Sequence, residues 1–179
     1  MTFVNKSLDQ MMQEINCNQL AYFDFWKPSE FPKRHKERNL YLGKYLDISN
    51  DYVDFLISKI PAESNIHPDN LLKSAIILTF ENALTRGNHC DINSAVSLKL
   101  FSGNKGSIFR IRDSGNGFPY VDFINKYYLG QKVHNGNGNG FIVFDFDLIE
   151  VAYEGKGNII NIMIKSGYSP ENSLANFQK

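Results

Sequence analysis

Apolar and polar residues alternate along several short segments of the chain, which is the pattern of β-strands with one buried face. Val96, Leu98 and Leu100 alternate with polar neighbours, the turn SGNKG follows, and a second apolar-polar run covers 107–113, so an antiparallel hairpin is expected. Further strands are predicted over Asn39–Leu46, Leu148–Tyr153 and Ile159–Lys165, the last two joined by the turn EGKGN.

Other segments space their apolar residues as helices do. The clearest one begins at Pro68 and Asp69, which suit a helix start, and ends at Gly87, which suits a helix end. Its apolar stripe consists of Leu71, Leu72, Ala75, Ile76, Phe80 and Ala83. Shorter helices are expected over 7–15, 51–60 and 140–146. Helices followed by an antiparallel meander predict an α+β two-layer sandwich.

Composition limits the possible classes of protein. The chain has 179 residues, 42% of them hydrophobic and 21% charged, which suits one sizeable folded core. Basic and acidic residues balance at 19 each, so neither a nucleic-acid nor a membrane partner is expected. No apolar run approaches the roughly 18 residues of a membrane span, and the first residues lack the apolar core of a signal peptide. With two cysteines outside any disulfide or metal spacing, a cytoplasmic protein is expected.

Three parts are expected along the chain. Residues 40–165 contain the predicted sheet and helices, whereas 166–179 read as a polar tail. Residues 1–39 are an N-terminal extension of unclear role. Their aromatic cluster either packs onto the main core or forms a partner or dimer surface. The cluster consists of Tyr22, Phe23, Phe25 and Trp26.

The segment IRDSGNGF, 111–118, is the first candidate for chemistry. Phe109, Ile111 and Asp113 share one face of the predicted strand, so the carboxylate is expected to point inward beside apolar side chains. Two glycines then allow a sharp turn. An inward acid before such a turn suits a flat polar ligand, although the same pattern also occurs in ordinary turns. After it, 119–139 loses regularity and ends in HNGNGNG, as functional or disordered loops do.

Three segments together resemble the gyrase and histidine-kinase ATPase superfamily, known as GHKL or Bergerat-fold proteins. They are ENALTRGN (81–88), IRDSGNGF, and GNGNGFIVF (136–144), in that order. The chain is most similar to the small bacterial serine/threonine kinases that act as anti-sigma factors. The resemblance covers 40–165. It implies a histidine-kinase-like ATP-binding domain with its helices on one face of the sheet, and ATP or ADP with Mg²⁺ as ligands.

The resemblance also implies roles for individual residues. Asn82 would hold Mg²⁺ through its amide oxygen, and Asp113 would accept a hydrogen bond from the adenine amino group. Gly115 and Gly117 would line the adenine pocket. Each assignment has a structural alternative, such as Asn82 bridging groups within the core.

The third segment would bind the phosphates. Gly138 and Gly140 would let backbone amides approach them at the start of a helix containing Phe141, and 119–137 would cover the nucleotide. Arg86 lies one helical turn beyond Asn82 and either reaches a phosphate or remains a solvated cation at the helix end.

One position departs from the family pattern. Leu78 stands four residues before Asn82, where the anti-sigma kinases have a general-base glutamate, and the neighbouring Glu81 points about 100° away around the helix. Three functions therefore remain open: a protein kinase, a nucleotide-sensing switch without transfer, and a domain that binds no nucleotide. By resemblance the partner is a small regulatory protein of the anti-anti-sigma kind or a sigma factor, and a homodimer is possible.

Overall fold

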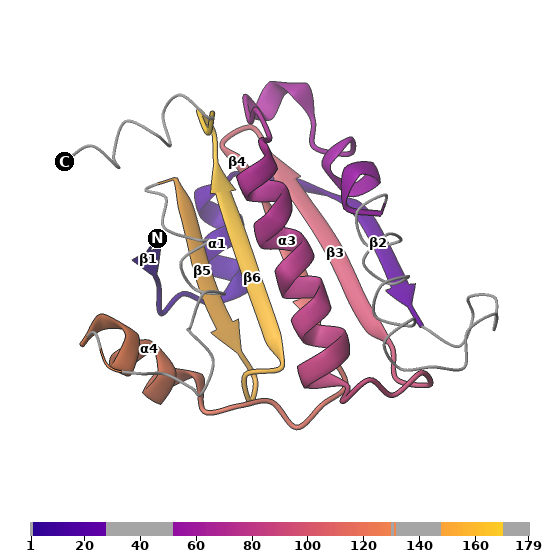
Figure 1. Cartoon of the computed structure of the whole chain (residues 1–179). Coiled ribbons are helices and arrows are strands. Elements are labelled where there is room, and N and C mark those ends of the chain that lie inside the picture. Colours follow the sequence, from indigo (N-terminus) through magenta and orange to yellow (C-terminus); the bar gives the residue numbers. More distant parts are fainter. Residues whose placement is uncertain (1, 28–51, 130, 132–147, 170–179) are drawn as a thin grey trace.

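The computed structural model describes residues 2–27, 52–129, 131 and 148–169. These residues form a six-stranded sheet with the strand order β1-β5-β6-β4-β3-β2 (Figure 1). The strands are β1 (Thr2–Phe3), β2 (Cys17–Trp26), β3 (Val96–Gly103), β4 (Gly106–Arg112), β5 (Ile149–Glu154) and β6 (Ile159–Lys165). Only the pairing of β1 with β5 is parallel among these neighbours, so the predicted α+β class with a mixed, mostly antiparallel sheet is confirmed.

Both predicted hairpins are confirmed. Gly103 pairs with Gly106 across β3 and β4, and Glu154 pairs with Ile159 across β5 and β6. Tight turns therefore join the strands, and β4 lies beside β6 at the centre of the sheet. As a result the C-terminal end of β4 and the turn 155–158 lie at the same end of the sheet (Figure 1).

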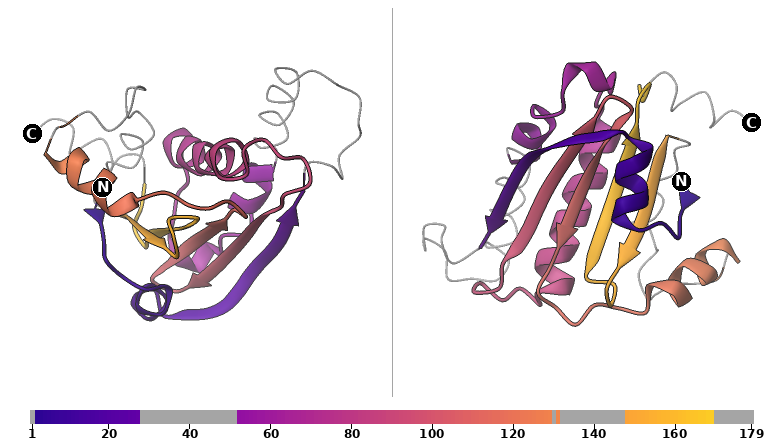
Figure 2. Two further views of the ribbon diagram at one scale, coloured as in Figure 1. Left: turned by 90° about the horizontal axis from the view of Figure 1, so that it is seen from below. Right: turned by 180° about the vertical axis from the view of Figure 1, so that it is seen from behind.

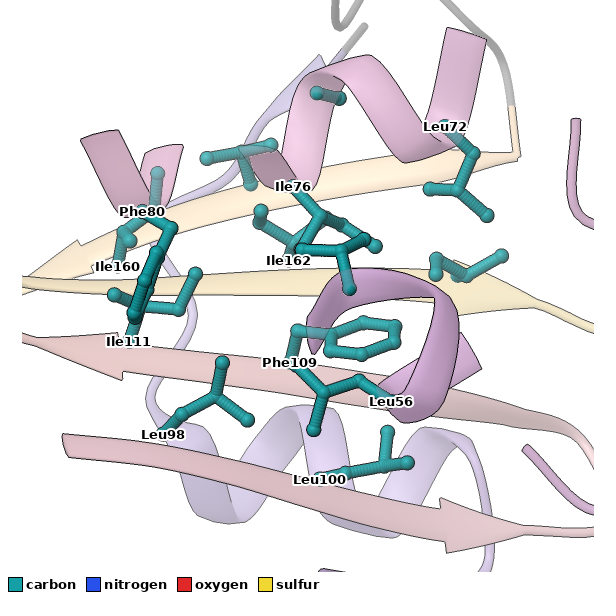
Figure 3. Close-up of a cluster of buried hydrophobic side chains, with 14 of the residues drawn as sticks. Leu56, Leu72, Ile76, Phe80, Leu98, Leu100, Phe109, Ile111, Ile160 and Ile162 are labelled. Atoms are coloured by element: carbon teal, nitrogen blue, oxygen red, sulfur yellow. The ribbon is translucent and has the colours of Figure 1, made fainter. Parts of the chain in front are cut away.

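Helix α3 (Asn70–Asn82) lies across one face of the sheet and continues into a π-helical turn, η3 (Ala83–Gly87). It begins as predicted, because Oδ1 of Asp69 accepts the backbone N–H of Leu72 at 2.8 Å. Residues 52–57 form a short helix next to it, followed by the 3-10 turn η2 (Ala62–Ser64). The main core between these helices and the sheet includes Leu56, Leu72, Ile76, Phe80, Leu98, Leu100, Phe109, Ile111, Ile160 and Ile162 (Figure 3).

The opposite face of the sheet is also covered. Helix α1 (Leu8–Glu14) packs there, and Met11 and Ile15 form a second buried cluster with side chains of the central strands (Figure 2). The expectation that helices lie on one face only, as in a two-layer sandwich, is therefore wrong. The physical reason is visible in β6, where consecutive residues from Ile160 to Ile164 are buried, so both faces of the strand need a cover.

Two elements differ from the sequence prediction. The aromatic cluster lies on β2, which pairs with β3 and so belongs to the sheet. Helix α4 (Tyr120–Tyr128) occupies part of the segment predicted to be irregular.

The segment predicted as a polar tail begins with residues that belong to the fold. Tyr168 is buried, and its hydroxyl donates to Asp69 at 2.9 Å. The expected strand 39–46 and helix 140–146 lie outside the described residues.

Candidate functional site

Three segments that are distant in sequence meet at one end of the sheet. They are the C-terminal turn of the long helix, the connection 113–119 that follows β4, and the turn 155–158 between β5 and β6 (Figure 1). Backbone contacts join them directly. The N–H of Phe118 donates to the carbonyl of Lys156 at 2.8 Å, and the N–H of Asp113 donates to the carbonyl of Asn158 at 3.1 Å. This junction contains the aspartate predicted to bind the base.

Asp113 follows the last residue of β4 and is half-buried. Its Oδ1 accepts the backbone N–H of Gly115 at 2.8 Å. Burial raises the pKa of the Asp113 carboxyl above its usual value, and the hydrogen bond from Gly115 offsets part of that effect. The expectation that this acid lies partly inside the protein therefore agrees with its position at the junction. Because a carboxylate has two oxygens, Oδ2 retains the capacity to accept a hydrogen bond from a ligand.

The glycines around Asp113 are required by close packing of the protein on itself. A Cβ on Gly115 would lie 2.0 Å from the carbonyl oxygen of Gly87, and a Cβ on Gly87 would lie 2.3 Å from the Asp113 carboxyl carbon. Gly117 has a φ of +76°, and its Cβ would lie 2.0 Å from the carbonyl oxygen of Lys156. Backbone therefore occupies the space that side chains at Gly115 and Gly117 would need. Any contact of these two residues with a ligand has to come from their other atoms.

Two asparagines that the sequence analysis did not assign hold this loop. Asn88 is buried, with 4% of its surface exposed, and its Oδ1 accepts the N–H of Ser114 at 2.8 Å. Its Nδ2 lies 3.1 Å and 3.2 Å from the carbonyl oxygens of Ser94 and Ala95. From the β5–β6 turn, Nδ2 of Asn158 donates to the carbonyl of Asp113 at 3.3 Å. Asn88 belongs to the segment ENALTRGN, and that membership was the only sequence signal.

The other predicted residues of the helix lie on its exposed end. Asn82 is the last residue of α3, and Arg86 lies in the π-helical turn that follows; both side chains are exposed. Four residues are slightly more than one turn of an α-helix and slightly less than one turn of a π-helix, so the two residues stay on the same side. Turns of this kind occur frequently at functional sites.

The position at which the resemblance predicts a general base is also in this helix. Leu78 is half-buried. Glu81 is half-buried too, and its Oε1 is buried without a hydrogen-bond partner among the described residues. Burial raises the pKa of the Glu81 carboxyl. A proton acceptor is therefore present near Asn82, but in the position next to it and not one helical turn before it.

The fit of Mg²⁺ to this end of the helix depends on few protein ligands. Asn82 presents an amide oxygen, a hard ligand of the type that Mg²⁺ accepts. Within the described ranges, no three His, Cys, Asp or Glu side chains lie close enough together to hold a metal ion. A set this small fits Mg²⁺ that is already bound to nucleotide phosphates, because Mg²⁺ usually keeps several waters and takes only one or two protein ligands.

The remaining predicted contacts are Gly138, Gly140 and Phe141, which lie outside the described residues. The chain matches no family model, and no curated protein matches it in sequence. Among the helices in the described part of the chain, none is long and apolar enough to cross a membrane.

Proposed function

We propose that this chain is an ATP-binding regulatory protein of the Bergerat-fold class, with Asp113 as the group that recognises the base. The observation that supports it most is the position of this carboxylate. It is half-buried at the end of a central strand and lies against the glycine that ends the long helix. The hydrogen bond from Gly115 goes to Oδ1, so Oδ2 has the capacity to accept from a ligand. Partial burial of a charge costs free energy, which a hydrogen bond from a ligand would offset.

The acceptor character of this carboxylate favours adenine over hypoxanthine, the base of inosine triphosphate, where position 6 of the base faces Asp113. A carboxylate only accepts hydrogen bonds, so Asp113 suits the exocyclic amino group of adenine. Inosine triphosphate has a carbonyl oxygen in that place, and two acceptors would then face each other. A site built to hydrogen-bond one group rejects an analogue lacking it, because its buried polar atom is left unpaired. ATP and ADP are therefore the proposed ligands.

The phosphates would extend from the base site towards the exposed end of the helix. There Asn82 supplies an amide oxygen for Mg²⁺ and Arg86 supplies a guanidinium for a phosphate oxygen. When bound, Mg²⁺ neutralises phosphate charge. Gly138, Gly140 and Phe141 are proposed as the remaining phosphate contacts, through backbone amides at a helix start.

A thermal-shift titration tests the binding claim. A ligand at 100 times its Kd stabilises the folded state by roughly 2.7 kcal/mol, so ATP and ADP should each raise the melting temperature. Asp113→Ala should remove the shift, whereas Arg86→Ala should reduce it. If ATP and ADP leave the melting temperature unchanged with and without Mg²⁺, nucleotide binding is refuted and the chain acts only as an interaction domain.

Two activities are compatible with such a site: phosphoryl transfer, and nucleotide sensing without transfer. They differ in whether a general base is needed where this chain has Leu78. By resemblance to the anti-sigma kinases, the bound ATP would phosphorylate a serine or threonine of a small regulatory protein, with a sigma factor as a further partner. With a leucine in place of the base, the same site would act as a nucleotide-sensing switch that changes partner affinity without transfer. Incubation with labelled ATP, Mg²⁺ and candidate partners distinguishes them. Label transfer that Asn82→Ala abolishes supports the kinase, and binding without transfer supports the switch.

A further inference from the structure

Asn88 joins three pieces of backbone that are separate in sequence. It immediately follows the π-helical turn, it accepts from Ser114 in the loop after β4, and it donates to the two carbonyls that precede β3. Both polar ends of the amide are thus used by backbone groups. Ser114 adds a parallel contact, since its hydroxyl donates to the carbonyl of Ala95 at 3.1 Å.

The backbone around Asn88 has an uncommon conformation. The next two residues, His89 and Cys90, have φ values of 52° and 58°, in the left-handed region that residues other than glycine seldom adopt. Hydrogen bonds hold this bend: the N–H of Asn88 donates to Ala83 at 2.9 Å, and that of Cys90 donates to Leu84 at 3.0 Å. Conformations of this kind cost free energy and concentrate at binding sites. The bend ends the helix directly beside the loop that contains Asp113.

The position of the Ser114 amide connects Asn88 with the base site. Ser114 is the residue after Asp113, so a hydrogen bond to its N–H restrains the peptide bond that joins the two residues. On the preceding side, the N–H of Asp113 donates to the carbonyl of Asn158 at 3.1 Å. The side chain of Asn158 also donates to the carbonyl of Asp113, which belongs to the same peptide bond that Asn88 restrains. The aspartate is therefore held from both sides, by Asn88 from the helix end and by Asn158 from the β5–β6 turn.

We propose that Asn88 is a positioning residue for nucleotide recognition, which orients the Asp113 carboxylate by bonding the amide that follows it. This inference rests on the proposed function. Asn88 needs no contact with the ligand, because it acts through Asp113. Its loss should weaken the contact with the adenine amino group and leave the contacts to the phosphates in place.

The test measures the Kd values of ATP and inosine triphosphate by calorimetry for three proteins. The unmodified protein should bind ATP at least about tenfold more tightly than inosine triphosphate. Asn88→Ala should raise the Kd for ATP about tenfold and hardly change the Kd for inosine triphosphate, so that the ratio falls towards one. The control is Asn161→Ala. Asn161 is a second buried asparagine, and its side chain hydrogen-bonds Arg110 and Glu154 on the neighbouring strands β4 and β5. Its removal should lower stability without changing either Kd.

A merely structural role for Asn88 predicts that both Kd values rise together or that neither changes, and either result overturns the inference. If the unmodified protein binds no ATP, the proposed function itself fails, and the role of Asn88 fails with it. If Asn88→Ala does not fold, hydrogen exchange on the unmodified protein replaces it. The Ser114 amide should be protected without nucleotide and become more protected with ATP; rapid exchange in both states contradicts the proposal.

Discussion

Replacement of Gly115 by alanine tests the junction most severely. The new methyl carbon would lie 2.0 Å from the carbonyl oxygen of Gly87 and 2.9 Å from Oδ1 of Asp113. Ordinary contacts begin at 3.4 Å, so the loop and the helix end have to separate by more than an ångström at the first of these points. The obstacle is backbone, which cannot rotate away as the end of a flexible side chain can.

The magnitude follows from two opposing effects. Overpacking of this kind costs about 1–3 kcal/mol. Loss of glycine reduces the freedom of the unfolded chain and returns about 0.4–1 kcal/mol. A net loss of about 1–2 kcal/mol is therefore expected for Gly115→Ala, or about 2–8 °C in melting temperature for a chain of this size. Because the Gly115 amide also holds the Asp113 carboxylate, the Kd for ATP should rise by at least about tenfold.

Urea unfolding and calorimetric ATP titration measure the two effects on the same protein. Gly167→Ala is the matched control. Gly167 has a φ of +87°, and a Cβ there would meet nothing within 4 Å in the described part of the chain. Its replacement should cost about 1–2 kcal/mol through backbone strain alone and leave ATP affinity unchanged. If Gly115→Ala retains full stability and affinity, the close packing of the helix end on the Asp113 loop is refuted.

Three further predictions concern other parts of the molecule. Burial alone would raise the pKa of Glu150, but Lys165 and Lys6 outweigh burial and lower that pKa. This carboxylate therefore contributes stability above about pH 4.3, and the contribution is lost as the pH falls further. The free energy of unfolding in urea should be lower at pH 3 than at pH 7, and the difference should be smaller in Glu150→Gln. Met11→Ala should cost about 2–5 kcal/mol in urea unfolding, because Met11 is fully buried under the sheet; a cost below about 1 kcal/mol would contradict the packing of α1. If the chain binds ATP without transfer, Leu78→Glu should produce label transfer to a partner, and transfer by the unmodified protein would show that Leu78 does not block it.

Much of the fold could be predicted because local signals determine it. Helix α3 begins at its aspartate cap and turns at Gly87, and each hairpin has alternating strands around a glycine-containing turn. Strand β2 was missed although its residues 17–26 are rich in aromatic strand formers. Its register with β3 shifts between Cys17 and Gln19 and again between Leu20 and Tyr22, which hides the alternation that a sequence pattern requires.

Helix α4 was missed although Tyr120, Phe123 and Ile124 have helical spacing, because it lies inside a segment that was interpreted as one glycine-ended loop. Distant residues also hold it in place. The hydroxyl of Tyr128 accepts a hydrogen bond from the N–H of Phe3 at 3.1 Å. The ring of Tyr120 stacks on that of Tyr153, with the ring centroids 5.4 Å apart. The partners come from the first and fifth strands, so no local pattern indicates them. The position of α1 also depends on residues that are distant in sequence. The sequence indicates a short amphipathic helix, but it does not indicate that the sheet has a second apolar face on which the helix packs.

The sequence indicated the candidate acid of the site and its glycine turn, but not the hydrogen bonds that hold them. Asp113 and its glycines follow from a strand that ends in an acid and a turn. The hydrogen bonds that hold it join residues 26 and 45 positions apart, from Asn88 to Ser114 and from Asn158 to Asp113. Such pairs depend on how helix, loop and hairpin meet in space. An asparagine in a polar loop carries no sign of them.

The most direct test of the central claim is the comparison of ATP and inosine triphosphate binding to the unmodified protein and to Asp113→Asn. Asparagine keeps the size of the side chain and an acceptor for the Gly115 amide. It also removes a charge that burial disfavours, so the free energy of unfolding at pH 7 should not fall. If Asp113 recognises the base, Asp113→Asn weakens ATP binding at least about tenfold and narrows or reverses the preference over inosine triphosphate. Equal ATP affinity in the two proteins would contradict it.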